Sequence, residues 1–299
     1  MNSSAELFEL ELPLPDAGLG ALGERLIGFD QRYRRLGRAF QMLLDPGSVE
    51  AWAEEHHGPN LHIIEVLSER YPLVILHGDV GTGKTAFAEA AADRLCRPPR
   101  PEGTLMKLST RVRGVGKVGE LSSLINDAFA EVEVAVGKKR AAILIIDEAD
   151  SLAASRDGDR SHHEDKVGVN TLIQKIDDIR RLDGRLLVFL CTNRFGTIDP
   201  ALIRRAGHVE HFTRPDDDER RALLDFDTKG LDISAADLAK VVKLTGRLGS
   251  RPGFTFSDIR TRLIPEAVLS AYPERPLKGA DLIAAAENLE PAPSLEEDV

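Results

Sequence analysis

The sequence has 299 residues, enough for one large domain or two modest ones, and 42% of them are hydrophobic, enough for a well-buried core. Its formal net charge of −10 disfavours a motor that grips nucleic acid through basic stripes, although a local basic patch is compatible with an acidic total. Cys96 and Cys191 have no metal-ligand spacing and are predicted to be reduced thiols. The chain does not begin with a basic-then-apolar signal and its apolar runs are strand-sized, so we expect a soluble cytoplasmic protein.

Residues 1–25 are predicted to form an N-terminal arm. The run ELFELELPLP alternates briefly before Pro and Gly interrupt it, so it is either a short edge strand or an extended segment. Helical spacing follows in GERLIGFDQRYRRLGRAFQMLL up to a DPG stop, and SVEAWAEEHH indicates a second short helix capped by Ser48. Trp52 on that helix is expected to pack in the core or between domains, and His56 and His57 are expected to be solvated.

Residues Gly78–Thr85 read GDVGTGKT and match the phosphate-loop pattern GxxxxGK[ST]. An apolar strand, LVILH, precedes the loop and an alanine-rich helix, AFAEAAADRL, follows it, so the helix N-terminus is directed at a bound anion. We expect Lys84 to reach the β- and γ-phosphates and the Thr85 hydroxyl to help hold Mg²⁺. The residues predicted to contact the nucleotide here are Gly78, Asp79, Val80, Gly81, Thr82, Gly83, Lys84, Thr85 and Ala86.

Acidic residues follow the apolar strand AAILII in the run ILIIDEAD. Residues at the carboxyl end of a parallel strand face the ligand crevice, so we expect Asp147 to bind Mg²⁺ through water and Glu148 to polarise the attacking water. The alternative is a pair of solvated carboxylates. Asn193 ends the next strand, LLVFLCTN, where its amide can hold the lytic water or a γ-phosphate oxygen, although Asn is also common in turns.

Arg204 and Arg205 follow in IDPALIRRAGHVEHF, between a predicted helix and the last predicted strand. A guanidinium at the edge of a subunit can reach the γ-phosphate of a neighbour and stabilise charge in the transition state. For each arginine alone, an ordinary surface position is an equally good interpretation.

Strands that read as continuous apolar runs alternate with helices, which predicts an α/β fold with a parallel five-stranded sheet covered on both faces. This large domain of the P-loop NTPase type is expected over residues 26–213, with linker helices at its start. Only helical patterns follow, so residues 214–290 are predicted to form a small helical lid domain. Residues 291–299 are acidic and contain proline, and we expect them to be a disordered tail.

The order GDVGTGKT, ILIIDEAD, LCTNR, IDPALIRR and a helical lid resembles the AAA+ ATPases. The resemblance implies a homohexameric ring that uses ATP and Mg²⁺ at sites between subunits. It makes Asn193 the first sensor, and Arg205 or Arg204 the finger that acts on the next subunit. Arg260 and Arg262, in FTFSDIRTRLIPEAV, are both candidates for the arginine of the second sensor in the lid.

Several stretches resemble one AAA+ subfamily, the pachytene-checkpoint or thyroid-receptor-interactor remodellers of HORMA-domain proteins. They are RLIGFDQRYRRLGRAFQMLL, IDEADSLAASR, HHEDKVGVNTLIQKIDDIRR and RLIPEAVLSAY. The resemblance implies that the ring engages the N-terminal segment of a HORMA protein and partially unfolds it. Fewer than eighty residues precede the phosphate loop, so a sizeable adaptor-binding domain is not expected there. Compact members of this kind resemble those of bacterial antiphage operons, where the HORMA protein activates a cyclic-oligonucleotide synthase.

The resemblance places the substrate-gripping pore loop in TRVRGVGKVGE, with Arg113, Val115, Lys117 and Val118 as its candidate contacts. This segment contains no aromatic residue, and valine buries less area than tryptophan, so each grip is expected to be weak. A weak grip suits partial unfolding of a short segment better than processive threading. The alternative is a plain flexible loop.

Two alternative functions are also compatible with the sequence. One is a clamp-loader-like or other nucleic-acid-linked ATPase, which the acidic balance disfavours. The other is a scaffold that binds ATP without useful hydrolysis, which the intact Lys84, Asp147 and Glu148 disfavour. The run HHED at residues 162–165 is interpreted as a solvated loop, because neighbouring residues rarely converge on one metal ion without other partners.

Overall fold

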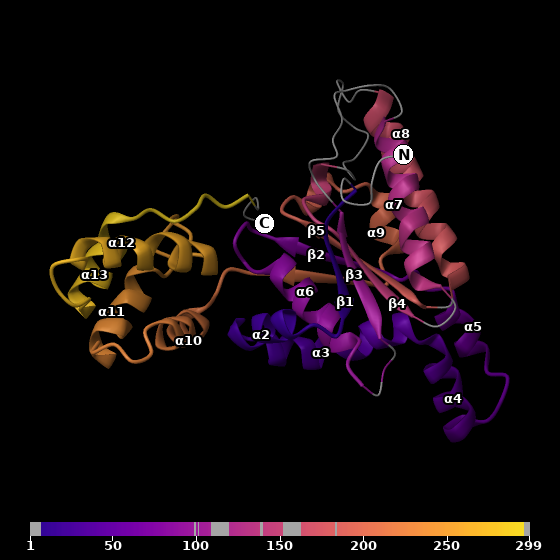
Figure 1. Cartoon of the computed structure of the whole chain (residues 1–299), viewed down its shortest axis with the longest axis horizontal. Helices are drawn as coiled ribbons and strands as arrows, with labels where there is room; N and C mark the ends of the chain where they lie inside the picture. The colour runs from indigo at the N-terminus through magenta and orange to yellow at the C-terminus, as the bar shows by residue number, and fades with distance from the viewer. Residues whose placement is uncertain are drawn as a thin grey trace. The chain divides into compact units, whose positions relative to one another are not determined.

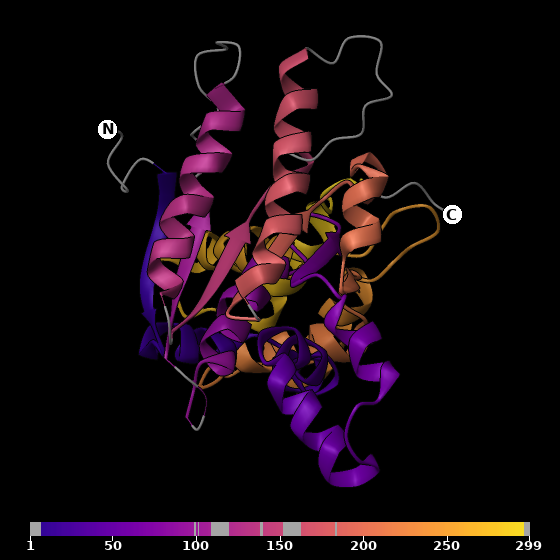
Figure 2. The same ribbon diagram turned by 90° about the vertical axis from the view of Figure 1, so that its right-hand side faces the viewer.

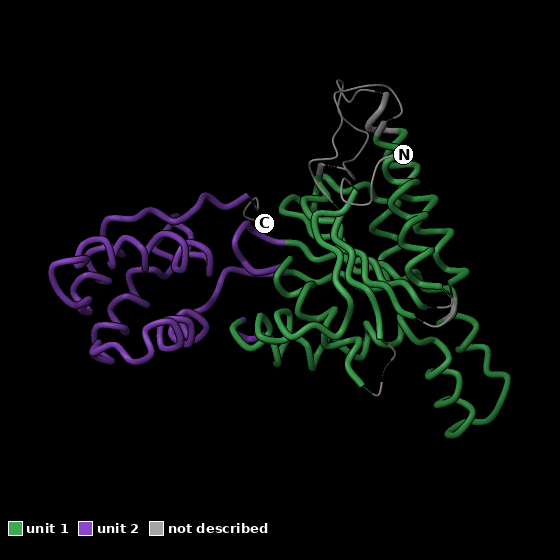
Figure 3. The backbone as a smooth tube through the Cα atoms, in the orientation of Figure 1, with its two compact units in different colours: residues 1–25, 29–77, 85–211 green, residues 26–28, 78–84, 212–299 purple. Residues whose placement is uncertain are grey.

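The computed structural model describes residues 7–98, 100, 102–108, 120–137, 140–151, 163–182 and 184–295. The chain divides into two compact units (Figure 3). Unit 1 comprises residues 1–25, 29–77 and 85–211, and unit 2 comprises residues 26–28, 78–84 and 212–299. The contacts of the phosphate loop therefore group it with the C-terminal part of the chain, although the strand before the loop belongs to unit 1.

The described part of the chain contains a six-stranded sheet with the order β1-β3-β4-β5-β2-β6. Figure 1 labels strands β1 to β5 of this sheet. The strands are β1 (Phe8–Leu14), β2 (Leu73–Gly78), β3 (Gly103–Leu108), β4 (Ala141–Ile146), β5 (Leu186–Thr192) and β6 (His208–Phe212). The pairs β3–β4, β4–β5 and β2–β5 are parallel, as the continuous apolar runs predict.

The prediction of five parallel strands is corrected at one edge, where β1 pairs antiparallel with β3 and places Leu12 opposite Leu105. Of the two possibilities for the N-terminal segment, the structure has the edge strand. Along β1, the buried Phe8 and Leu14 alternate with exposed Glu9 and Glu11, which is the pattern of a strand with one covered face. The alternation in the sequence was too short to show that the segment joins the sheet.

Helices cover both faces of the sheet because successive side chains of each buried strand point to opposite sides. Helices α7 (Glu120–Val136) and α8 (His163–Asp178) lie side by side (Figure 2), and their buried side chains belong to the same hydrophobic cluster as Val188 of β5. The next residue, Phe189, contacts Phe40 of α3 (Phe29–Leu44) at a ring distance of 5.2 Å. Phe40 also meets Phe87 of α6 (Lys84–Leu95), so α3 and α6 belong to the opposite layer.

The remaining N-terminal helices are α2 (Ala17–Arg25), α4 (Pro46–His57) and α5 (His62–Ser68). Helix α4 begins earlier than predicted, because Asp45 accepts a hydrogen bond from Ser48 N and Pro46 occupies the first turn, where its missing N–H costs nothing. The cap is therefore Asp45 instead of Ser48. Trp52 is 50% exposed and stacks on His56 at 5.8 Å, so the expectation of a packed Trp52 is wrong.

Residues 212–289 of unit 2 form a separate helical core. Its helices are α10 (Asp217–Asp227), α11 (Ala235–Leu244), the π-helix η5 (Asp258–Leu263), α12 (Ile264–Ala271) and α13 (Gly279–Asn288). Asp216 and Glu219 form a capping box at the start of α10, and Ser234 caps α11. Buried Leu223, Val241 and other apolar side chains close this core. No helix within the described residues is long and apolar enough to span a membrane.

Candidate nucleotide-binding site

The phosphate loop connects β2 to α6 and contains glycines at positions where any other residue would be strained. Gly78 has φ 139°, and a Cβ there would lie 2.1 Å from the carbonyl oxygen of Phe212. Gly81 has φ 78°, and a Cβ would lie 2.7 Å from Thr255 Oγ1. Both the left-handed backbone and the close neighbours therefore require the glycines that the sequence pattern identifies.

Lys84 is the first residue of α6 and is only 6% exposed. Its ammonium donates hydrogen bonds to the carbonyl oxygens of Gly78 and Asp79, both at 2.8 Å. Thr82 Oγ1 also donates to the Asp79 carbonyl oxygen, at 2.8 Å. The side chains of Lys84 and Thr82 thus bond to carbonyl oxygens of the loop and hold its backbone conformation.

The first turn of α6 and the end of β4 bring together the two predicted Mg²⁺ ligands. Thr85 Oγ1 donates a hydrogen bond of 2.9 Å to Asp147 Oδ2, across a sequence separation of 62 residues. Asp147 Oδ1 accepts from the backbone N–H of Glu148 at 2.9 Å, which fixes the orientation of the carboxylate. A hydroxyl and a carboxylate oxygen are donors that Mg²⁺ prefers, so these two residues fit the metal that the fold implies. Since Thr85 follows Lys84 directly, this pair adjoins the phosphate loop in the chain.

Glu148 is exposed and has a left-handed backbone with φ 46°. This conformation is uncommon for a residue with a Cβ and costs on the order of 1 kcal/mol, and such strain is concentrated at functional sites. The residue lies directly after the strand-end carboxylate, where a water-polarising group is predicted.

Asn193 follows β5, the parallel neighbour of β4, so its position is at the same edge of the sheet as Asp147. Asp150, in the short helix η2 (Ala149–Ser151), accepts hydrogen bonds from Thr192 Oγ1 at 3.2 Å and from Asn193 N at 3.5 Å. Asp150 therefore holds the backbone that carries Asn193. The sequence analysis missed this role, although Asp150 is the last acid of the run ILIIDEAD.

The structure distinguishes the two arginines at the end of α9 (Pro200–Arg205). Arg205 grips both carboxylate oxygens of Asp177, with Nε 2.5 Å from Oδ1 and Nη2 2.9 Å from Oδ2. The hydrogen bond to Asp177 raises the pKa of Arg205 above its usual value. Arg204 is exposed and has no ion pair with another residue of the described part of the chain. Arg205 is thus paired within its own chain, whereas Arg204 is exposed.

The two candidate lid arginines are both paired within unit 2. Arg260 donates from Nε and Nη2 to Asp227, at 2.7 and 2.9 Å. Arg262 makes a single bond of 3.1 Å to Asp258, and its side chain is 43% exposed. The more exposed and less tightly held Arg262 suits a role toward a ligand better than Arg260.

A third arginine of unit 2 contacts the phosphate loop itself. Arg214 Nε donates to Asp79 Oδ2 at 2.7 Å, and Ser294 and Leu295 also donate to the Asp79 carboxylate. Burial alone would raise the pKa of Asp79, but the hydrogen bonds from Arg214, Leu295 and Ser294 outweigh it and lower that pKa. Residues 291–295, expected to be part of a disordered tail, are therefore held by hydrogen bonds. A local sequence pattern carried no signal for this contact.

Some predicted features lie outside the described residues. The candidate pore-loop residues are Arg113, Val115, Lys117 and Val118, within the segment 109–119 that the structure does not describe. His162 is also outside, whereas residues 163–165 belong to the beginning of α8, not to a loop. Within the described residues, no group of three or more potential metal-ligating side chains is found.

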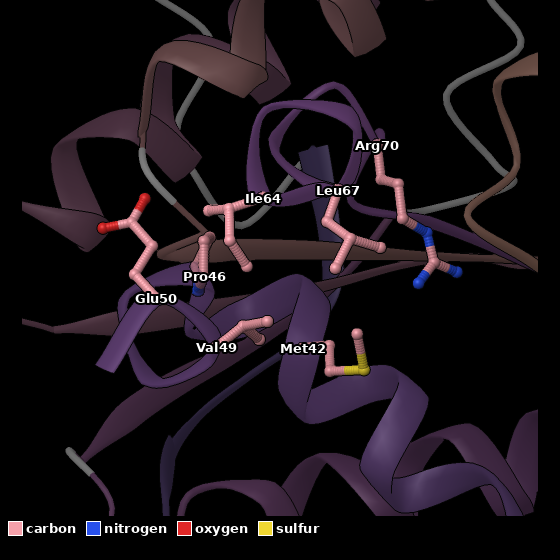
Figure 4. Close-up of a pocket in the computed structure, with 7 residues that line it drawn as sticks. All are labelled: Met42, Pro46, Val49, Glu50, Ile64, Leu67 and Arg70. Atoms are coloured by element: carbon pink, nitrogen blue, oxygen red, sulfur yellow. The ribbon is translucent and has the colours of Figure 1, made fainter. Parts of the chain in front are cut away.

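A cavity of about 20 Å³ lies among the linker helices α3, α4 and α5 (Figure 4). Its lining residues are Met42, Pro46, Val49, Glu50, Ile64, Leu67 and Arg70. Small-molecule sites usually have volumes of about 300–1,000 Å³, and a single water needs roughly 10–15 Å³. The cavity therefore has room for a water molecule and none for a nucleotide.

Comparisons with known proteins agree with this geometry. Residues 74–214 match the family described as "ATPase family associated with various cellular activities (AAA)". The chain is 47% identical over 292 residues to CD-NTase-associated protein 6 of Escherichia coli strain KTE188, covering 97% of this chain and 98% of the relative. A chain of the structure described as "E. coli MS115-1 HORMA:CdnC:Trip13 complex" matches with a TM-score of 0.91 and 38% identity, covering 98% of this chain and 99% of that one. Rhizobiales Trip13 matches with a TM-score of 0.74 and 33% identity, covering 96% of this chain and 100% of that one.

The mostly parallel sheet, the phosphate loop and the strand-end acids, taken with the family match, define an AAA+ ATPase that binds nucleotide. Within that class, the chain belongs to the Trip13-like family of CD-NTase-associated protein 6. The family predicted from the order of its motifs is thereby confirmed.

Proposed function

We propose that the chain is an ATP-driven remodeller that assembles as a homohexamer and partially unfolds a HORMA-domain protein in a bacterial antiphage signalling system. The single observation that carries the ATP-driven part is the contact between Thr85 and Asp147 beside the phosphate loop. The near-complete match to CD-NTase-associated protein 6 and to a chain of the HORMA:CdnC:Trip13 complex supports the partner. By the same similarity, a cyclic-oligonucleotide synthase is a further partner of the assembly.

Each described site residue receives a role in this proposal. The backbone of the phosphate loop and Lys84 bind the triphosphate. Thr85 and, through water, Asp147 hold Mg²⁺, which supplies charge neutralisation and orients the phosphates when bound. Glu148 accepts a proton from the attacking water, and Asn193 orients that water or the γ-phosphate. Asp150 maintains the position of Asn193 through the hydrogen bonds described above.

The neighbouring subunit is proposed to supply Arg204 as the finger. Arg205 would have to break its two-bond pair with Asp177 before it could reach another subunit. Arg204 is exposed and has no ion pair within the described residues, so it needs no such rearrangement. The predicted pore-loop residues Val115 and Val118 keep their proposed role as weak contacts for the HORMA segment.

The substitution Glu148→Gln tests the proposal, because an amide keeps the shape of the side chain and cannot accept the proton. We expect turnover to fall by about 10²–10⁴-fold while ATP binding is retained. The measurement is phosphate release by the purified ring with and without its HORMA partner, beside equilibrium binding of labelled ATP. The HORMA partner should stay bound to the Glu148→Gln ring, and unchanged hydrolysis by this variant would refute the role of Glu148. Stimulation by DNA that falls steeply with salt would instead favour a nucleic-acid-linked ATPase.

A further inference from the structure

The second position of the phosphate loop carries a negative charge, in a loop built to bind an anion. Asp79 is 4% exposed. A carboxylate inside such a loop opposes triphosphate binding by like-charge repulsion unless other groups neutralise it. Its carboxylate accepts hydrogen bonds from Arg214 Nε at 2.7 Å, Ser294 Oγ at 2.8 Å and Leu295 N at 2.8 Å. The compensating groups thus come from residues far along the chain.

Arg214 connects Asp79 to two further segments of unit 2. Its Nη1 donates to the carbonyl oxygen of Gly253 at 2.6 Å, and its Nη2 donates to that of Ala292 at 2.9 Å. A planar guanidinium with five N–H donors can satisfy three acceptors at fixed angles, which a lysine cannot do. Arg214 therefore fixes the orientation of Asp79 relative to the backbone of the C-terminal segment.

The C-terminal segment, residues 291–295, is anchored by two buried carboxylates. Ala292 N donates to Asp258 Oδ2 at 3.2 Å, and Asp258 is 3% exposed at the start of η5. Two and three residues later, Ser294 and Leu295 bond to Asp79. The segment is neither helix nor strand, so no regular backbone hydrogen bonds hold it. Its hydrogen bonds to the charged carboxylates of Asp79 and Asp258 hold it in place. The same segment therefore engages the phosphate loop and the element that carries Arg262.

We propose that Asp79, Arg214 and the C-terminal segment form a positioning unit for the phosphate loop, so that docking of the segment raises the affinity of the loop for a nucleoside triphosphate. When docked, the segment adds two uncharged hydrogen-bond donors to the guanidinium of Arg214, and together they stabilise the Asp79 carboxylate and hold the loop in one conformation. When the segment is released, Asp79 keeps fewer donors and opposes the phosphates. These residues act through the loop and do not touch the reacting atoms. The inference rests on the proposed use of this loop for ATP.

Linkage makes the effect reciprocal, because a segment that strengthens nucleotide binding must itself be held more tightly when nucleotide is bound. The backbone N–H of Leu295 reports directly on docking, since its acceptor is Asp79. We expect ATPγS with Mg²⁺ to slow hydrogen exchange in the peptide that contains Leu295. Exchange that is unaffected by saturating ATPγS would contradict the coupling.

The substitution Leu295→Pro removes the N–H donor, and Leu295→Ala is the matched control that keeps it. Hydrogen bonds to charged groups are stronger than neutral ones, so Leu295→Pro should weaken ATPγS binding by about tenfold. Leu295→Ala should bind ATPγS as the wild type does. In steady-state assays the KM for ATP should rise while kcat is retained. The milder Ser294→Ala should act in the same direction, and the melting temperature of each ring shows whether it is folded.

The double variant Asp79→Asn with Leu295→Pro separates a specific effect from a general one. Once the carboxylate is replaced, Leu295→Pro should weaken ATPγS binding by less than about twofold, because the charge that needed neutralising is gone. An equal loss in both backgrounds, or wild-type affinity of Leu295→Pro alone, would overturn the positioning role. If the wild-type ring failed to bind ATPγS at all, the proposed ATP function would fail first, which is a distinct result.

Discussion

Asp79 lies within the phosphate loop and Asp147 is bonded to Thr85 at its end, and the two carboxylates differ in burial and in partners. Asp147, directly after β4, accepts hydrogen bonds from Thr85 Oγ1 and from Glu148 N. Its Oδ2 lies 3.6 Å from Lys107 Nζ, and its side chain is 24% exposed. Asp79, inside the loop, is 4% exposed and is surrounded by Arg214 and the C-terminal segment. The first carboxylate is partly exposed and is proposed to hold Mg²⁺, whereas the second is buried and bonded to donors of the protein. The role of an acidic residue in these motifs is therefore indicated by its burial and its hydrogen-bond partners, and its position in the motif alone does not indicate it.

The largest difference between these carboxylates is expected in turnover. Asp147→Asn removes the charged oxygen proposed to hold Mg²⁺ through water, and should lower ATP hydrolysis by about 100-fold or more. Asp79→Asn keeps an acceptor for Leu295 and should retain hydrolysis within about tenfold of the wild type. Phosphate release at saturating ATP compares the two variants, and a greater loss in Asp79→Asn would reverse the assignment.

A second difference is expected in stability. Arg214→Met leaves the buried Asp79 without its guanidinium, which should cost about 3 kcal/mol because breaking a buried pair leaves a charge uncompensated. The matched control is Arg221→Met, which breaks the more exposed pair with Asp225 on α10 and should change stability little. Urea unfolding of the chain measures both. Equal, small losses in the two variants would show that Asp79 does not depend on Arg214.

A smaller difference is expected in the response to acid. The pKa of Asp79 is lowered in the folded chain, so the unfolded chain binds this proton more readily. Its contribution to stability is therefore fully present above pH about 4 and is lost as the pH falls through the lowered folded pKa. Urea midpoints from pH 7 down to pH 3 should fall less steeply for Asp79→Asn than for the wild type. Parallel curves would contradict the lowered pKa.

Sequence reasoning succeeded where function is encoded locally. The pattern of Gly78–Thr85 determines strand, loop and helix together, and the apolar run before Asp147 determines a strand end at the same edge of the sheet. Local patterns predicted Thr85 and Asp147 as ligands of one Mg²⁺, because parallel strand ends meet at one edge, and the structure places the two side chains in contact.

The remaining features depend on contacts between distant residues. Asp79 and Arg214 are separated by 135 residues, and no spacing rule pairs them. The acidic, proline-containing end of the chain predicted disorder, because composition does not show that two buried carboxylates hold residues 292–295. The sequence named Arg205 or Arg204 as the finger, and the pairing of Arg205 with Asp177 distinguishes them in the structure. The antiparallel edge strand β1 is a similar case, since its short alternation predicted a strand or an arm equally.

We propose that an arginine of the next subunit completes each nucleotide site, and mixing two variants in one ring tests this. Rings of Arg204→Ala alone should lose about 10³-fold or more in ATP hydrolysis, and rings of Lys84→Ala alone should be inactive. Mixed rings contain sites with an intact phosphate loop on one side and an intact Arg204 on the other, so hydrolysis should partly return. The same mixture made with Arg205→Ala is the control for a residue that acts within its own subunit. Mixtures with Arg204→Ala that stay as inactive as either parent would contradict the account.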